Sequence, residues 1–128
     1  MATSLQAAGA VLSSGTEGIG YSTGAGGTVT QATSKTTGVT LNKISGQITM
    51  NNATVNAGVI VSFTLTNSTI ASTDMLLMNH VTTGTAGSYL LNARPASGSA
   101  TIDVRNTSAS NLAEAIVIGY SVIKSVSS

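Results

Sequence analysis

The feature that most constrains the fold is a short stretch, Gly58–Asn67, in which apolar and mostly hydroxylated side chains alternate. The apolar set is Val59, Val61, Phe63 and Leu65. A repeat of two residues places this set on one side of an extended chain, which is the pattern of a β-strand with one buried face. The stretch also holds the single Phe of a chain without Trp. We therefore expect it to be the central strand of a small β-sandwich.

Further segments with strand character follow at short intervals and are separated by turn residues. They are 28–31, 38–41, 46–50, 59–66, 74–81, 88–93, 100–106 and 114–123. No segment shows a convincing helical period, and the spacing of 8–12 residues between turns is typical of sandwiches and barrels. The sequence predicts an all-β fold, a β-sandwich or jelly roll of about eight antiparallel strands.

Some segments carry more specific expectations. Residues 74–81 and 114–123 are apolar on both faces, so we expect covered strands, with 74–81 in the middle of a sheet. The turn-forming residues 82–87 are expected to close a hairpin onto 88–93. Pro95 has no backbone N–H to give to a sheet, so it should mark a strand end or an edge strand.

The first 27 residues differ from the rest because Gly, Ser, Ala and Thr dominate them. Such a composition builds no core of its own. We expect residues 1–27 to form an extended N-terminal arm and residues 28–128 to form the β-sandwich domain. An ordered arm would have to lie on this domain or on a neighbouring molecule. Its apolar positions are the candidate contacts to a capsid or to another subunit: Leu5, Leu12, Ile19 and Tyr21.

Charge limits the classes of partner. Charged residues make up 7% of the 128 residues and the net charge is +1, so no basic stripe is available for nucleic acid or an anionic membrane. The polar surface must come instead from 20 Thr, 18 Ser and 9 Asn. A nearly uncharged, hydroxyl-rich surface favours association between protein molecules. The chain has no Cys, which excludes disulfides and thiolate metal sites.

Catalytic readings of the sequence are weak. Residues 18–27 are rich in glycine but lack the spacing and the following helix of a dinucleotide-binding loop. The single His80 could join a Ser with Asp74 or Asp103, and Asp74 could meet Glu114, but no nucleophile-elbow sequence accompanies them. We expect His80 to be a structural or interface histidine and the protein not to be an enzyme. Catalytic, cofactor and metal residues are predicted to be none.

Three Asn residues stand in the N-glycosylation pattern: Asn52, Asn67 and Asn106. Chance accounts for such matches in a chain so rich in Asn, Ser and Thr. The first twelve residues show neither a basic start nor a long apolar core, so we expect no signal peptide and synthesis inside the cell. With Met1 in place and no visible tag, we expect a complete gene product. No run approaches the ~20 apolar residues of a membrane span.

One resemblance sharpens this picture. The run from Gly20 to Ala53 (GYSTGAGGTVTQATSKTTGVTLNKISGQITMNNA) resembles small virion proteins of tailed bacteriophages and prophages. Further matches are VSFTLTNS at 61–68, LAEAIVI at 112–118 and VIK at 122–124, so the resemblance covers about residues 20–124. It implies an oligomeric, typically trimeric, β-sandwich fixed to a phage particle. It carries no catalytic residues that could be transferred.

Two functions follow from this resemblance, and a third reading is an enzyme. The first is a capsid decoration (cement) protein that binds the major capsid protein on the virion surface after assembly in the host cytoplasm. Its other partners would be copies of itself, a homotrimer or alternatively a dimer. The alternative is a tail-fibre or spike tip that binds a host receptor. A hydrolase of cell-wall glycans lacks a credible acid/base pair.

Overall fold

The computed structural model describes residues 9–128, and all regular structure in that range is β-strand. The eight strands of this range are β1 (Gly26–Thr30), β2 (Val39–Thr40), β3 (Ser45–Thr49), β4 (Ile60–Thr66), β5 (Met75–Thr82), β6 (Tyr89–Ala96), β7 (Ser99–Asn106) and β8 (Val117–Ile123). The all-β prediction is confirmed, and each predicted strand segment overlaps an observed one. Residues 9–128 contain no helix, and hence none suited to crossing a bilayer.

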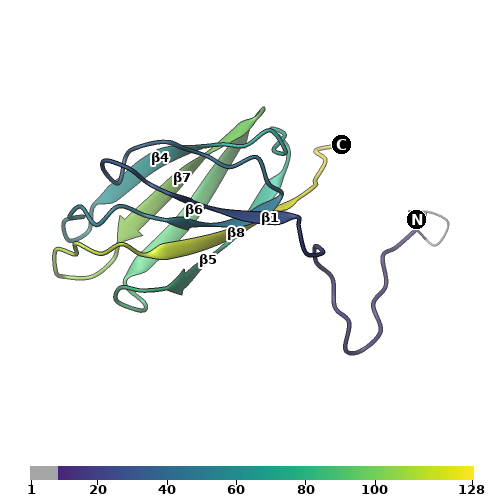
Figure 1. Ribbon diagram of the computed structural model, residues 1–128, viewed down its shortest axis with the longest axis horizontal. Helices are drawn as coiled ribbons and strands as arrows, with labels where there is room; N and C mark the ends of the chain where they lie inside the picture. The colour runs from purple at the N-terminus through teal and green to yellow at the C-terminus, as the bar shows by residue number, and fades with distance from the viewer. Residues whose placement is uncertain (1–8) are drawn as a thin grey trace.

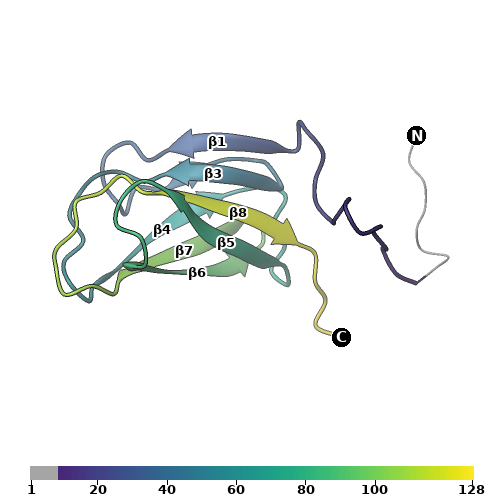
Figure 2. The ribbon, with the colours of Figure 1, turned by 90° about the horizontal axis from the view of Figure 1, so that it is seen from below.

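The strands form two four-stranded sheets that lie face to face (Figures 1 and 2). The order is β1-β3-β8-β5 in one sheet and β2-β4-β7-β6 in the other. As predicted, β4 lies inside its sheet, between β2 and β7. Pro95 lies in β6, an edge strand, as its missing N–H requires.

Both sheets are mixed, which corrects the expectation of purely antiparallel strands. The pairs β1–β3 and β2–β4 are parallel, and the other neighbours are antiparallel. The reason lies in the connections: from β1 to β6 the chain passes from one sheet to the other at every link. A strand reverses direction at each short link, so strands two links apart run the same way and can pair in parallel.

The same alternation corrects two local expectations. Residues 82–87 close no hairpin, because β5 and β6 belong to different sheets. Strand β5 is also not a covered central strand, since it forms the edge of its sheet next to β8. Its inner residues Leu76 and Met78 are partly buried against the core, whereas Met75 and Leu77 point outward and are 64% and 66% exposed.

The core lies between the sheets and draws on the alternating residues of both. In β4 and β7, Phe63, Leu65, Ile102 and Val104 are at most 2% exposed. Facing them from the other sheet are Ile48, Ile118, Tyr120 and Val122. The inward orientation of Val61, Phe63 and Leu65 confirms the predicted alternation from residue 61 on, whereas Val59 precedes β4 and is 44% exposed. Burial of such side chains contributes about 25 cal/mol for each Å² of apolar surface removed from water.

Two asparagines of the glycosylation pattern are wholly buried. Asn67 follows β4 and Asn106 ends β7, and each is 0% exposed. The Asn67 side-chain oxygen accepts hydrogen bonds from the backbone N–H and hydroxyl of Thr69, and Asn106 does the same with Ser108. Their amide groups donate to the carbonyls of Lys43 and Val55. The Asn-x-Ser/Thr pattern therefore forms internal turns here, with hydroxyls that complete the hydrogen bonding.

Lys35 is buried too, although it is a lysine. It is 3% exposed, and its Nζ donates to the backbone carbonyls of Asn51 and Glu114. Burial lowers the pKa of the Lys35 amine, and the nearby Glu114 charge opposes that shift. Lys35 thus ties the link before β2 to the segments that follow β3 and precede β8.

Candidate interaction surface

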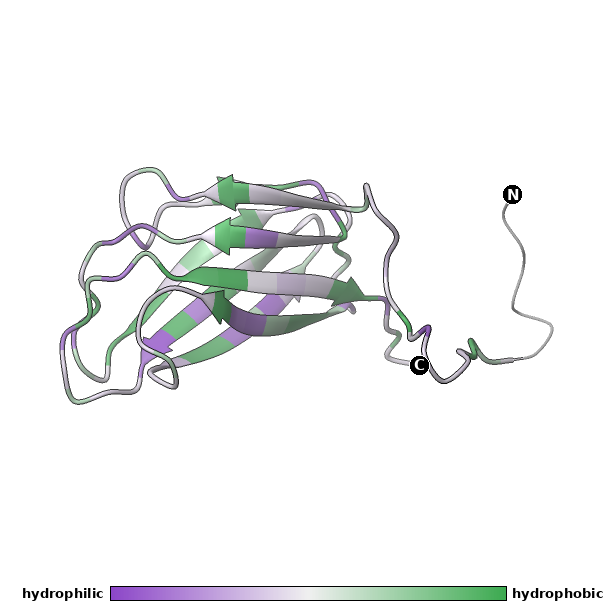
Figure 3. Cartoon of the chain, turned by 60° about the horizontal axis from the view of Figure 1, so that its bottom comes forward, coloured by the Kyte–Doolittle hydropathy of each residue, from purple (hydrophilic) through white to green (hydrophobic). Residues whose placement is uncertain are grey.

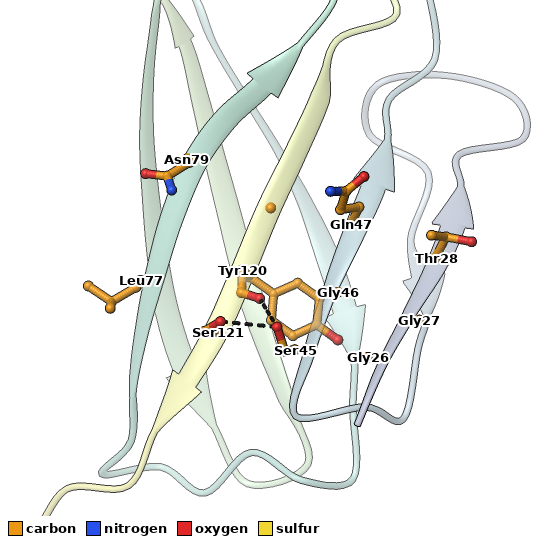
Figure 4. A pocket seen from close by; sticks show the side chains of 11 residues that line it. Gly26, Gly27, Thr28, Ser45, Gly46, Gln47, Leu77, Asn79, Tyr120 and Ser121 are labelled. Atoms are coloured by element: carbon orange, nitrogen blue, oxygen red, sulfur yellow. Dashed lines mark hydrogen bonds between the residues drawn. The ribbon is translucent and has the colours of Figure 1, made fainter. Parts of the chain in front are cut away.

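The outer face of the β1-β3-β8-β5 sheet carries two parallel rows of side chains, set by the strand register. The first row is Gly26, Ser45, Ser121 and Leu77, and the second is Thr28, Gln47, Gly119 and Asn79. Together they line a shallow hollow of about 610 Å³ (Figure 4). Because Gly26 and Gly119 have no side chains and the two serines are small, the floor is lower than its borders.

Figure 4 shows how the borders are placed: Leu77 and Asn79 on β5 lie across β8 from Gln47 and Thr28. On the floor, the Ser45 hydroxyl is 3.0 Å from that of Ser121 and 3.2 Å from the Tyr120 carbonyl oxygen, to which it can donate. The lining thus offers hydroxyls, amides and one apolar side chain, but no charge. Such a surface suits an uncharged partner that can exchange hydrogen bonds.

Glycines serve this sheet in two different ways. A Cβ added at Gly26, on the outer face, would meet nothing closer than the Ser45 carbonyl oxygen at 3.5 Å. A Cβ at Gly46, which faces inward, would lie 2.7 Å from both the Gly27 carbonyl oxygen and Leu41 Cδ2. Gly46 is therefore required by packing, while nothing in the packing requires glycine at Gly26.

An apolar stripe continues the hollow along the β5 edge. It consists of Met75, Leu77 and Val81 on β5 with Ile123 on β8, which are 64%, 66%, 45% and 44% exposed. Met75 and Ile123 are direct register partners. We call the hollow and this stripe together the uncharged face. An exposed apolar edge strand without Lys or Pro is the kind of edge that pairs with other chains.

The opposite outer face, on the β2-β4-β7-β6 sheet, is charged. Asp103 accepts hydrogen bonds from Ser62 at 2.6 Å and Asn92 at 3.0 Å, and it forms a two-pronged ion pair with Arg94 at 2.9 Å. These donors, Arg94 first, hold the pKa of Asp103 well below its usual range. We call the residues Ile60, Ser62, Leu90, Asn92, Arg94, Asp103 and Arg105 the charged face.

The residues considered for catalysis are held by other partners. Asp74 pairs with Lys124 at 2.6 Å, and the hydrogen bond from Lys124 lowers the pKa of Asp74. His80 donates from Nε2 to the Thr83 carbonyl at 2.5 Å and packs edge-on against Tyr89, with ring centroids 5.6 Å apart. Asp74 and His80 lie near opposite ends of β5, so a catalytic Ser–His80–Asp74 arrangement is not formed.

Glu114 takes a structural position near His80. It accepts hydrogen bonds from the Tyr89 hydroxyl at 2.7 Å and the Thr85 hydroxyl at 2.7 Å, which lower its pKa. Burial, followed by Glu114 itself, raises the pKa of Tyr89. In residues 9–128 no three His, Asp or Glu side chains come together in a way that could hold a metal ion.

The predicted arm contacts are placed as follows. Leu5 lies outside the described residues. Leu12 and Ile19 are 82% and 80% exposed, and Tyr21 is 47% exposed with its hydroxyl donating to the Val122 carbonyl. We call residues 9–25 the leading segment; it forms no strand and leads away from the sheets (Figure 1).

Sequence reasoning did not find the uncharged face. Residues 75–82 carry no charge, but because the segment is apolar on both sides, the sequence predicts a strand that is covered on both sides. Figure 3 shows the same ambiguity, because hydrophobic segments appear on edge and interior strands alike.

Comparisons with models of protein families, with curated proteins and with solved structures give no match.

Proposed function

We propose that this protein is a structural component of a tailed-phage virion, a decoration protein that binds the major capsid protein through its uncharged face. The observation that carries the proposal is the exposed apolar stripe on an edge strand that bears no charge. The resemblance of residues 20–124 to small phage virion proteins supports a place on a phage particle. The low share of charged residues, 7%, supports a protein as the binding partner.

We also propose the β-sandwich class with a homotrimer as the assembled state, and an extended N-terminal arm that ends at residue 25 and not at 27 as expected, because β1 begins at Gly26 and pairs with β3. The two facing sheets support the sandwich. A jelly roll is built from antiparallel strands, so the parallel pairs β1–β3 and β2–β4 argue for another sandwich connectivity. The exposed apolar side chains of the leading segment, Val11, Leu12 and Ile19, support contacts with a neighbour.

The energetics fit repeated, individually modest contacts. Fully burying a Leu or Met side chain contributes roughly 1.5–3 kcal/mol, and the four stripe residues are about half exposed, so each has about 1 kcal/mol left to gain. An oligomer presents several such stripes at once, which raises the overall affinity without any new type of contact.

The test uses capsids stripped of the protein. Wild type should bind them saturably and increase their resistance to heat, whereas Leu77→Asp, which places a charge in the stripe, should bind at least about tenfold more weakly. Val126→Asp is the matched control, because Val126 is 82% exposed but lies outside the strands. Equal binding by all three proteins would refute this use of the face.

A tail-fibre or spike tip is the second candidate. The hydroxyl and amide lining of the hollow favours it, since Ser45, Gln47 and Asn79 could exchange hydrogen bonds with a sugar. Saturable binding to host cells, lost in Gly26→Val and absent with capsids, would establish this function and overturn decoration.

A further inference from the structure

The charged face contains one cation without an ionic partner. The ion pairs among residues 9–128 are Arg94–Asp103 and Lys124–Asp74, so Arg105 is left unpaired in that part of the chain. Arg105 is exposed and stands in register between Ile60 on β4 and Leu90 on β6, which are 55% and 60% exposed. These residues line a shallow depression of about 360 Å³ together with Asn92, Arg94 and Asp103. The site suits an acidic group flanked by apolar ones.

The leading segment carries that pattern. Glu17 is exposed and has no ionic partner among the described residues, while the other three acids are held by Lys124, Arg94 and Tyr89. Leu12 and Ile19 lie on either side of it in the sequence and are at least 80% exposed. The acid without a partner and the arginine without a partner thus each stand among exposed apolar side chains.

The same chain cannot join the two. The Tyr21 hydroxyl donates a hydrogen bond to the Val122 carbonyl near the end of β8. The four residues from Tyr21 to Glu17 span at most about 14 Å. The end of β8 lies beside the start of β7, because Asn67 donates to the Lys43 carbonyl and Lys124 donates to the Thr69 carbonyl. Arg105 lies about 20 Å farther along β7, on the outer side of the other sheet, so Glu17 of the same chain does not reach it.

We propose that residues 9–20 of one copy lie on the charged face of a second copy, with Glu17 paired to Arg105 and with Leu12 and Ile19 packed against Ile60 and Leu90. The leading segment lies at one end of the molecule, and β7 ends, just after Arg105, at the other (Figure 1). The contact is therefore head to tail, and repeating it closes a ring or continues as a chain. This contact deepens the proposed self-assembly by naming the two surfaces that meet, and it does not depend on which particle the protein decorates.

Charge exchange in the full-length protein tests the pairing, with sedimentation velocity over a range of concentrations as the readout. Glu17→Arg and Arg105→Glu should each weaken self-association about tenfold or more, because each places like charges together. The double variant Glu17→Arg/Arg105→Glu should restore association to within about threefold of wild type. Lys43→Glu, a reversal at an exposed lysine away from the charged face, is the matched control and should associate like wild type.

Cross-linking provides a second measurement that does not rely on weakened association. The natural chain has no Cys, so Leu12→Cys/Leu90→Cys should give disulfide-linked multimers under oxidation, and Leu12→Cys/Val126→Cys should give far fewer. The proposal would be overturned if wild type is monomeric at every concentration or if the two single variants associate normally. It would also be overturned if the double charge-exchange variant stays dissociated or if the disulfides form within one chain. Loss of capsid binding by Leu77→Asp with self-association retained would separate this contact from the proposed function.

Discussion

The two outer faces of this molecule are built on sheets of equal strand number but differ in chemistry. On the uncharged face, small residues, amides and exposed apolar side chains surround the hollow, and no residue that lines it is charged. On the charged face, Arg94, Asp103 and Arg105 stand beside Ile60 and Leu90. Three of the nine charged residues of the chain stand on the charged face and none lines the hollow, so the two faces differ in the chemistry that they offer a partner.

The largest expected effect separates inner from outer apolar residues. Phe63→Ala should lower the free energy of unfolding by about 3–5 kcal/mol, because it leaves a cavity between the sheets. Leu77→Ala, on the uncharged face, should change it by less than about 0.5 kcal/mol. Urea denaturation measures both. A large loss in Leu77→Ala would show that the stripe serves stability, and the comparison of the faces would fail.

Two glycines of the β1-β3-β8-β5 sheet differ in what an added side chain would meet. Gly46→Ala points a methyl group at the Gly27 carbonyl and Leu41, so it should destabilise by about 1–3 kcal/mol. Gly26→Ala adds the same group to the floor of the hollow and should stay within about 0.5 kcal/mol of wild type. Thermal unfolding compares the pair, and equal losses would contradict the assignment of Gly26 to a binding surface.

Acid should affect the charged face more than the uncharged one. The pKa of Asp103 is lowered in the folded state by Arg94 and Ser62, so its contribution to stability is present above the unfolded pKa of about 4 and is lost as the pH falls below it. Asp103→Asn should therefore flatten the fall in stability below about pH 4, measured by denaturation across pH. Leu77→Ala should keep the wild-type slope. An unchanged slope in Asp103→Asn would mean that the ion pair contributes little.

Salt should produce the smallest effect and act on one face only. Self-association through Glu17 and Arg105 should weaken a few-fold when the ionic strength rises from about 0.1 M to 1 M, because exposed ion pairs are screened. Binding through the uncharged face should hold or strengthen over the same range. Sedimentation and capsid binding measured in parallel would reveal the contrast. Equal salt responses would remove the distinction between the faces.

The sequence predicted the strands better than their arrangement. The alternation around Phe63 identified β4 and its buried side, since a period of two leaves little choice of face. It did not reveal that β5 is an edge strand, because the apolar pattern of Met75–Thr82 is compatible with a strand covered by other parts of the protein on one side or on both sides. Nor could residue patterns show the alternation between sheets that makes β1 and β3 parallel, since this depends on where each connection leads.

The interaction surface was also beyond the sequence for a spatial reason. Its rows join residues from four strands, such as Gly26 and Leu77, that are far apart along the chain and meet only through the register. Leu12 and Ile19, two of the predicted contact residues, are exposed and therefore accessible to a partner. Tyr21 is hydrogen bonded to the Val122 carbonyl of its own chain. Leu5 stays a prediction.

The most direct test of the central claim is hydrogen–deuterium exchange of the full-length protein, free and bound to stripped capsids. The claim is that the uncharged face is where the partner binds. We expect the amides of β5, Met75–Thr82, to exchange markedly more slowly in the bound protein, with those of β6 near Leu90 changing less. Unchanged exchange in β5, with protection confined to β6 and β7, would contradict the claim.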